Sequence, residues 1–305
     1  MRLVADIGGT NSRFALSMNG EVQADTLRRY ANDEFASPEQ LIETYLQDIA
    51  TPVREMVLAV AGPGEIHSAR LTNRPWRFEA AGLASLVGCD DVWIINDLAA
   101  LGYAVPRLPS DRLTRLIDHP VPPGIQRQYL VIGIGTGFNV SPVADVNGAP
   151  VCLTVEAGHA SLPQVVAAEL ETHQAGLSAH FPTIEHLFSG RGLSRLYGLI
   201  SGADRISAQQ IIAAQHAADP VAGGIADLYA RLIGLISGEM AQLYLPRAGV
   251  FFAGSIAREL FATRAVGQFH RAFSCPSGVT GLSVSVILDD AAALLGCAAF
   301  RTAPG

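Results

Sequence analysis

One short pattern occurs twice in the chain: an apolar run, a glycine-containing turn, an alternating run and an Asn-Gly pair. The threonines of the two turns, Thr10 and Thr136, lie 126 residues apart, and the asparagines Asn19 and Asn147 lie 128 residues apart. Asn-Gly between alternating runs favours a two-residue hairpin turn. Matched order at nearly matched spacing predicts a duplicated unit, and this duplication constrains the fold more than composition does.

The duplication extends to later apolar runs, which pair as 57–62 with 250–254 and 92–95 with 284–288. Between them lie helical patterns such as 38–50, for which Ser37 is a suitable N-cap residue. The second half carries additional helical stretches over about 163–245. We therefore predict that each half contains three antiparallel strands followed by alternating helices and strands, which form a mixed sheet covered by helices.

A chain of 305 residues exceeds the usual size of a single core, so two lobes enclosing a central cleft are expected. We predict a smaller N-terminal lobe over 1–107, completed by a C-terminal helix at about 290–305, and a larger lobe over 108–289. The proline-rich stretch 106–123 is the candidate crossing between the lobes.

The chain contains no lysine, so all 21 basic side chains are arginines, and the net charge is −7. The absence of lysine excludes a P-loop lysine, a protein-kinase strand lysine and Schiff-base chemistry. An acidic chain without a basic stripe also disfavours nucleic acid as a partner.

The four cysteines never form a CxxC pair, and we interpret them as reduced thiols. Asp6 interrupts the N-terminal apolar run, which argues against a signal peptide. No uninterrupted apolar run approaches the roughly 18 residues of a membrane span. We expect a cytoplasmic protein with no membrane partner.

Both glycine turns suggest phosphate binding. Successive backbone N–H groups in the turns Gly8-Gly9-Thr10 and Gly135-Thr136-Gly137 would form anion-binding nests, and a pair of them could hold a polyphosphate. Asp6, at the end of the first strand, suits Mg²⁺ held through its water shell. The alternatives are ordinary hairpin turns and an acid that only caps its turn.

Asp97 comes after four apolar residues and Asn96, and is expected at the edge of the sheet, where ligands often bind in α/β folds. A carboxylate there can accept the proton of an attacking hydroxyl, because phosphoryl transfer needs mainly positioning and charge stabilisation. The alternative is that Asn96-Asp97 begins a helix as its N-cap, and the two roles are compatible.

Six sequence blocks together resemble the bacterial glucokinases of the non-ROK group, within the superfamily of hexokinases and actin-like ATPases. They are 5–13, 71–76, 94–97, 135–137, 156–159 and 185–190, with a looser match at 253–254. The cysteine cluster that binds zinc in ROK relatives is missing, which favours the other group. The resemblance implies a two-lobed actin-like ATPase fold, with duplicated ribonuclease H-like domains and mixed five-stranded sheets flanked by helices.

The resemblance also implies site residues for an ATP-dependent hexose kinase, with glucose as the favoured substrate, Mg²⁺ as cofactor and a homodimer as the assembly. Asp97 would be the general base. The sugar would be bound by Asn96, Asp97, Glu156, His159 and Glu185. The nucleotide would be bound by Ala5, Asp6, Ile7, Gly8, Gly9, Thr10, Asn11, Gly135, Thr136, Gly137 and Gly254.

Three residues depart from the family pattern. Asn139 and Ala157 stand where the family has glycines, and Ser255 replaces a glycine in the turn matched to the adenosine site. No departure removes a catalytic group. A sugar-responsive regulator without turnover, or a phosphotransferase acting on acetate or polyphosphate, remains an alternative function.

Overall fold

The structure is a computed structural model that describes residues 1–62, 64–65, 67–121, 124, 127–216, 219–275, 279 and 281–301. The chain forms two compact units. Unit 1 comprises residues 1–109, 150–152 and 289–305, and unit 2 comprises residues 110–149 and 153–288.

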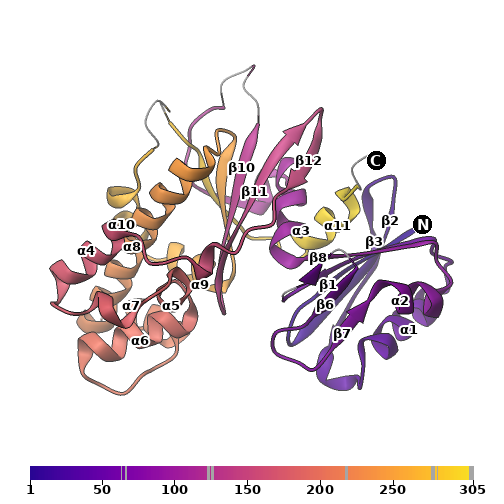
Figure 1. The fold of residues 1–305 in the computed structure, drawn as a ribbon, viewed down its shortest axis with the longest axis horizontal. Coiled ribbons are helices and arrows are strands. Elements are labelled where there is room, and N and C mark those ends of the chain that lie inside the picture. The colour runs from indigo at the N-terminus through magenta and orange to yellow at the C-terminus, as the bar shows by residue number, and fades with distance from the viewer. Residues whose placement is uncertain are drawn as a thin grey trace. The chain divides into compact units, whose positions relative to one another are not determined.

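Unit 1 is built on a five-stranded mixed sheet (Figure 1). Its order is β3-β2-β1-β4-β8, from strands β1 (Arg2–Ile7), β2 (Asn11–Met18), β3 (Glu21–Ala31), β4 (Glu55–Val60) and β8 (Asp91–Asn96). β2 is antiparallel to β1 and β3, whereas β1, β4 and β8 are parallel. The carboxyl ends of β1, β4 and β8 therefore meet at one edge of the sheet.

Helices cover both faces of this sheet (Figure 1). Leu3, Ala5 and Ile7 of β1 belong to a core shared with α1 (Pro38–Ile49) and α2 (Ala80–Val87). Val4, which points to the opposite face, belongs to a core shared with α3 (Asp97–Ala104) and α11 (Ala292–Ala299). The run of apolar residues in β1 thus reflects burial on both faces.

The C-terminal helix α11 packs closely on α3, which begins at the predicted base Asp97 (Figure 1). A Cβ atom at Gly296 would lie 1.7 Å from the carbonyl oxygen of Ala100, so only glycine allows this approach. Arg2 donates from Nη1 to the carbonyl of Phe300 at 2.8 Å, which satisfies a free carbonyl beyond the helix end. Residues 302–305 of the predicted C-terminal helix lie outside the described part of the chain.

Short elements complete unit 1. A three-stranded antiparallel sheet contains β5 (Gly64–Glu65), β6 (Ser68–Arg70) and β7 (Arg77–Glu79), and its β6–β7 connection is the 71–76 block. The 3₁₀ turns are η1 (Asn32–Glu34) and η2 (Val105–Arg107).

Unit 2 repeats the strand order of unit 1 and adds one strand. The sheet runs β12-β11-β10-β13-β14-β9, from β9 (Leu113–Ile117), β10 (Gln128–Ile134), β11 (Phe138–Val146), β12 (Ala149–Cys152), β13 (Gly249–Ala253) and β14 (Val284–Ile287). Residues 150–152 of the edge strand β12 are those counted with unit 1. β10 is antiparallel to β11 and parallel to β13, and β13 is parallel to β14. The first five strands match β3-β2-β1-β4-β8 in order.

The expected five strands are therefore correct for unit 1 and one too few for unit 2. β9 pairs antiparallel with β14 and lies inside the stretch 106–123, for which the sequence predicts a crossing and no strand. The β9 sequence Leu113-Thr114-Arg115-Leu116-Ile117 does not alternate strictly between apolar and polar residues, so it carries no clear strand signal of its own. Pro122 and Pro123 lie outside the described residues.

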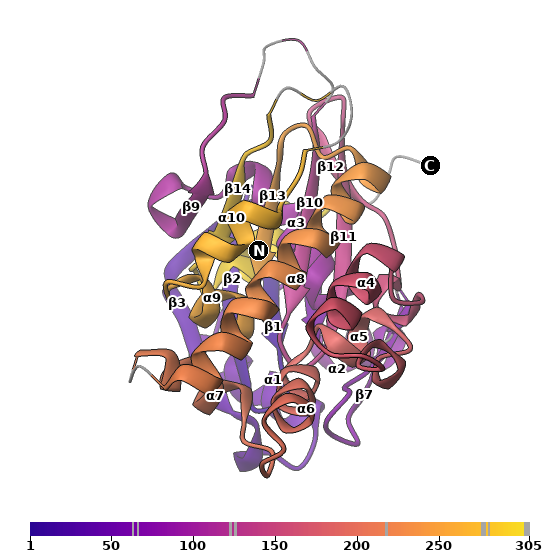
Figure 2. The ribbon, with the colours of Figure 1, turned by 90° about the vertical axis from the view of Figure 1, so that its left-hand side faces the viewer.

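The helices of unit 2 surround one long core helix, α8 (Pro220–Tyr244), which contacts α7 and α10 (Figure 2). The others are α4 (Gln164–His173), α5 (Ile184–Leu187), α6 (Gly190–Ser201), α7 (Ala208–His216), α9 (Ser255–Phe261) and α10 (Val266–Ala272), with 3₁₀ turns η3 (Ser110–Arg112), η4 (Ala157–His159) and η5 (Ser178–His180). Among the described helices, α8 alone is long and apolar enough to span a membrane. Because 72% of that stretch is buried, it resembles a core helix.

Both predicted hairpins have the expected turn. Asn19 and Gly20 have φ of 56° and 83°, and Asn147 and Gly148 have φ of 54° and 82°. Positive φ at both central residues is the type I′ geometry that Asn-Gly favours. The repeated turn and the repeated strand order confirm the duplication.

Candidate active site

The first glycine turn joins β1 to β2 and is closed by a hydrogen bond from Gly8 N to Asn11 O at 3.1 Å. Asn32, which is fully buried, donates from Nδ2 to Gly8 O at 2.8 Å and from its backbone N to Thr10 O at 2.8 Å. Its Oδ1 accepts from the Ser12 hydroxyl at 2.7 Å. The turn is therefore held from behind by a buried side chain.

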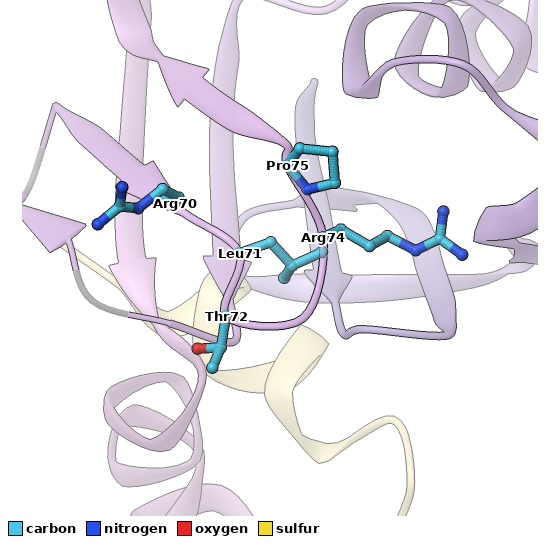
Figure 3. Close-up of a pocket in the computed structure, with 5 residues that line it drawn as sticks. All are labelled: Arg70, Leu71, Thr72, Arg74 and Pro75. Atoms are coloured by element: carbon cyan, nitrogen blue, oxygen red, sulfur yellow. The ribbon is translucent and has the colours of Figure 1, made fainter.

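The 71–76 connection lies against the same turn. Arg74 donates from Nε to Gly9 O at 2.7 Å, and a Cβ at Gly9 would meet the Asn73 side chain at 3.4 Å. This connection lines a pocket of about 390 Å³ formed by Arg70, Leu71, Thr72, Arg74 and Pro75. Figure 3 shows the guanidinium groups of Arg70 and Arg74 pointing in opposite directions.

Asp97 is the first residue of α3, directly after β8. Its Oδ1 and the Oδ1 of Asn96 each accept from Leu98 N at 2.9 Å, so the N-cap interpretation is confirmed. Burial, and to a smaller extent the negative charge of Asp6, raises the pKa of Asp97 to about 6. A carboxyl group with this pKa is largely ionised at pH 7 and still basic enough to accept a proton.

Asp6 lies at the same sheet edge as Asp97, because Asp6 is in register with Ala59 and Ala59 with Ile95. Arg13 donates from Nη1 to Asp6 Oδ2 at 3.1 Å. Burial raises the pKa of Asp6, and the Arg13 charge opposes this effect. Asp6 is thus one half of a partly buried ion pair.

The second glycine turn, in unit 2, is closed by a hydrogen bond from Gly135 N to Gly137 O at 3.0 Å. Gly135 O accepts from Gly190 N at 2.8 Å, at the start of α6. Gly254, with φ of 95°, lies beside this turn, because a Cβ on it would be 2.3 Å from Ile134 O. The structure therefore brings together the predicted residues 135–137 and Gly254.

Glu185 reaches the second glycine turn as well. Its Oε2 accepts from Phe138 N at 3.2 Å and would lie 2.5 Å from a Cβ at Gly137. Arg191 approaches Oε1 at 3.5 Å. The side chain is about one-third exposed, so it can still accept hydrogen bonds from a ligand.

Asn139 positions the loop that carries Glu156. Its Nδ2 donates to Val155 O at 2.7 Å and to Glu156 Oε2 at 3.2 Å, and its Oδ1 accepts from Ala157 N at 3.0 Å. Asn139 and Ala157, two of the three departures from family glycines, therefore contact each other. His159 is exposed at the end of η4.

The donor set near Asp6 fits a hydrated Mg²⁺. No group of three or more His, Cys, Asp or Glu side chains that could hold a metal gathers within the described ranges. Magnesium keeps several waters and commonly binds through one or two carboxylates together with substrate phosphates. The neighbouring carboxylates of Asp6 and Asp97 match that pattern without a complete protein cage.

Three contributing residues escaped the sequence analysis. The role of Asn32 could not be predicted, because in sequence a buried asparagine after a strand cannot be distinguished from an exposed asparagine in a turn. Arg74 lies inside the 71–76 block, but its residue type alone suggests no particular role there. Asn139 was noted only as a departure, and the side-chain spacing that makes it a bridge appears only in three dimensions.

Comparisons with known proteins agree over the whole chain. The model of the family described as Glucokinase matches residues 3–303. A glucokinase of Stenotrophomonas maltophilia is 32% identical over 325 aligned residues, which cover 99% of this chain and 97% of the relative.

Solved structures show the same likeness. A glucokinase from an Antarctic psychrotroph has a TM-score of 0.77 and 26% identity, covering 98% of this chain and 97% of that one. A ROK hexokinase from Thermus thermophilus has a TM-score of 0.65 and 18% identity, covering 97% of each chain, which supports the fold alone. These likenesses confirm the predicted α/β fold of the actin-like ATPase type.

Proposed function

Because the chain belongs to the glucokinase family and is an ATP-dependent glucose kinase, we propose that it phosphorylates the 6-hydroxyl of glucose with Asp97 as the general base. The observation that carries the proposal is the place of Asp97: a carboxyl group at the end of β8 with a pKa of about 6. Its neighbour Asn96 and the glycine turn of the same unit supply the groups that a sugar hydroxyl and a phosphate need.

In the proposed step, Asp97 accepts the proton of the 6-hydroxyl as that oxygen attacks the γ-phosphorus. The bond from the γ-phosphorus to the β,γ-bridging oxygen breaks, and ADP leaves with the bond's electron pair. The protein contributes mainly alignment and charge stabilisation, for which backbone N–H groups serve without any lysine.

The remaining site residues divide by ligand chemistry. We propose that Asn96, Glu156, His159 and Glu185 bind sugar hydroxyls, since carboxylates accept from them and amide or imidazole groups donate or accept. Residues 5–11 and 135–137 would hold the phosphates, and Gly254 would lie against the adenosine. Asp6 would hold Mg²⁺ through water. A bound Mg²⁺ would neutralise charge on the phosphates.

A coupled assay of ADP release over a panel of hexoses tests this function. We expect release that depends on sugar and is fastest with glucose. Sugar binding by calorimetry without ADP release would instead support the alternative, a sugar-responsive regulator. Release that is independent of sugar, or that depends on acetate, would contradict a hexose kinase. A homodimer in the cytoplasm is part of the same proposal, and sedimentation of the purified protein tests the assembly.

A further inference from the structure

The peptide groups of the first glycine turn are fixed from outside the turn. Asn32 Nδ2 holds Gly8 O at 2.8 Å, and Arg74 Nε holds Gly9 O at 2.7 Å. In a trans peptide, the N–H points opposite to the C=O in the same plane. Fixing these two carbonyls therefore turns the N–H groups of Gly9 and Thr10 to the other side of the turn.

Those two N–H groups remain available. No backbone or side-chain acceptor within the described part of the chain receives a hydrogen bond from the N–H of Gly9 or Thr10. Adjacent N–H groups that point the same way form an anion-binding nest. Two consecutive glycines would otherwise sample many orientations, so a fixed nest requires an external restraint.

Arg74 is itself immobilised. Its guanidinium also donates to Asn32 O at 3.3 Å, pairs with Asp33 and stacks on the Trp76 ring at 5.3 Å from the ring centroid. The negative charge of Asp33 thus partly compensates the charge of Arg74. The N–H donors of the guanidinium already bind two backbone carbonyls and this carboxylate. These contacts describe a restraint on the backbone rather than a direct phosphate ligand.

We propose that Arg74, together with Asn32, is a positioning residue that pre-organises the Gly8-Gly9-Thr10 nest for the phosphates of the nucleotide. The inference rests on the proposed function for the identity of the ligand, and it adds the residues that set the geometry of the turn. Because the chain has no lysine, binding of the nucleotide phosphates then depends on oriented backbone N–H groups. Groups that are already oriented need little rearrangement when the ligand binds.

The test compares Arg74→Ala and Arg74→Lys with Arg70→Ala as the matched control. Arg70 lines the same pocket, and its guanidinium points away from that of Arg74 (Figure 3). Binding of inorganic tripolyphosphate, ATP and glucose is measured by calorimetry. Hydrogen exchange of a peptide spanning the turn reports its order without nucleotide.

We expect both Arg74 variants to weaken tripolyphosphate and ATP binding about 10-fold, as for loss of a charged hydrogen bond, with glucose binding within about 2-fold of the parent. Exchange in the turn should rise in both variants, and Arg70→Ala should match the parent. The Arg74→Lys variant should not recover phosphate binding, because one flexible ammonium group cannot replace the planar set of N–H donors of the guanidinium.

Three results would overturn the inference. Restoration of tripolyphosphate binding by Arg74→Lys would indicate that charge, not orientation, matters. Unchanged tripolyphosphate binding in Arg74→Ala would show that Arg74 does not position the glycine turn for phosphate binding. Parallel loss of glucose and tripolyphosphate binding would indicate a general structural role. If the parent protein binds tripolyphosphate through this turn yet shows no glucose-dependent ADP release, the proposed function fails while the inference stands.

Discussion

At the scale of single residues, the proposed chemistry depends on one carboxyl group whose surroundings raise its pKa and would make it a better base. Asp97 is partly buried at the start of a helix, and Asp6 adds negative charge from the neighbouring strand end. Both effects favour the protonated form, which raises the pKa, while hydrogen bonds from the helix N-terminus oppose them. The outcome, a pKa of about 6, suits proton transfer near neutral pH.

This pKa predicts the acid limb of the pH–rate profile. Since the base must be ionised, kcat/KM for glucose should fall as the pH drops through about 6, and about tenfold per pH unit below it. Steady-state rates between pH 4.5 and 8 measure the limb. Histidines titrate in the same range, so His159→Gln is the control and should keep the limb. A limb near pH 4 would contradict the raised pKa.

At the scale of elements, the loop before η4 is stabilised by one side chain from β11. Asn139 bridges Val155, Glu156 and Ala157, so the departures at Asn139 and Ala157 form one local feature. The backbone of the buried Ala157 does not have a positive φ, so this position does not require glycine. The side-chain amide of Asn139 instead holds residues 155–157 in place. The position of Glu156 therefore depends on a residue 17 positions earlier in the chain.

Asn139→Asp tests this bridge. The substitution keeps the Oδ1 acceptor for Ala157 N but replaces the donor with an oxygen that repels Val155 O and the Glu156 carboxylate. We expect the KM for glucose to rise about 10-fold while the KM for ATP stays within about 2-fold. Ala157→Gly, which keeps the same N–H, is the control and should change either constant little. Equal effects on both substrates would argue against a specific role.

Local chemistry explains which elements could be predicted. Asn-Gly has few alternatives to a type I′ turn, and Ser37 before Pro38 begins a helix as expected, with its hydroxyl accepting from Gln40 N. The edge strand β9 was missed because its pairing depends on β14, which lies far away in the sequence. The bracing by Asn32 and Arg74 was missed for the same reason: contacts of sequence-distant side chains leave no periodic signal.

At the scale of the whole molecule, the duplicated sheet order explains why each unit carries a glycine turn at the same topological point. In both units the glycine turn joins a central strand (β1 or β10) to its antiparallel neighbour (β2 or β11). A parallel strand (β4 or β13) pairs with the other edge of that central strand. The α/β fold and the family could therefore be predicted from sequence. The lobe boundaries at 107 and 289 stay predictions, and so do the roles of the site residues, because those roles depend on contacts with bound ligands.

The most direct test of the account is the turnover of Asp97→Ala with glucose binding measured on the same preparation. We predict that glucose still binds, held by the other residues proposed to contact the sugar, while kcat falls about 10²–10⁴-fold, the usual contribution of a general base. Glucose binding with near-normal kcat in this variant would contradict the assignment of Asp97 as the group that deprotonates the 6-hydroxyl.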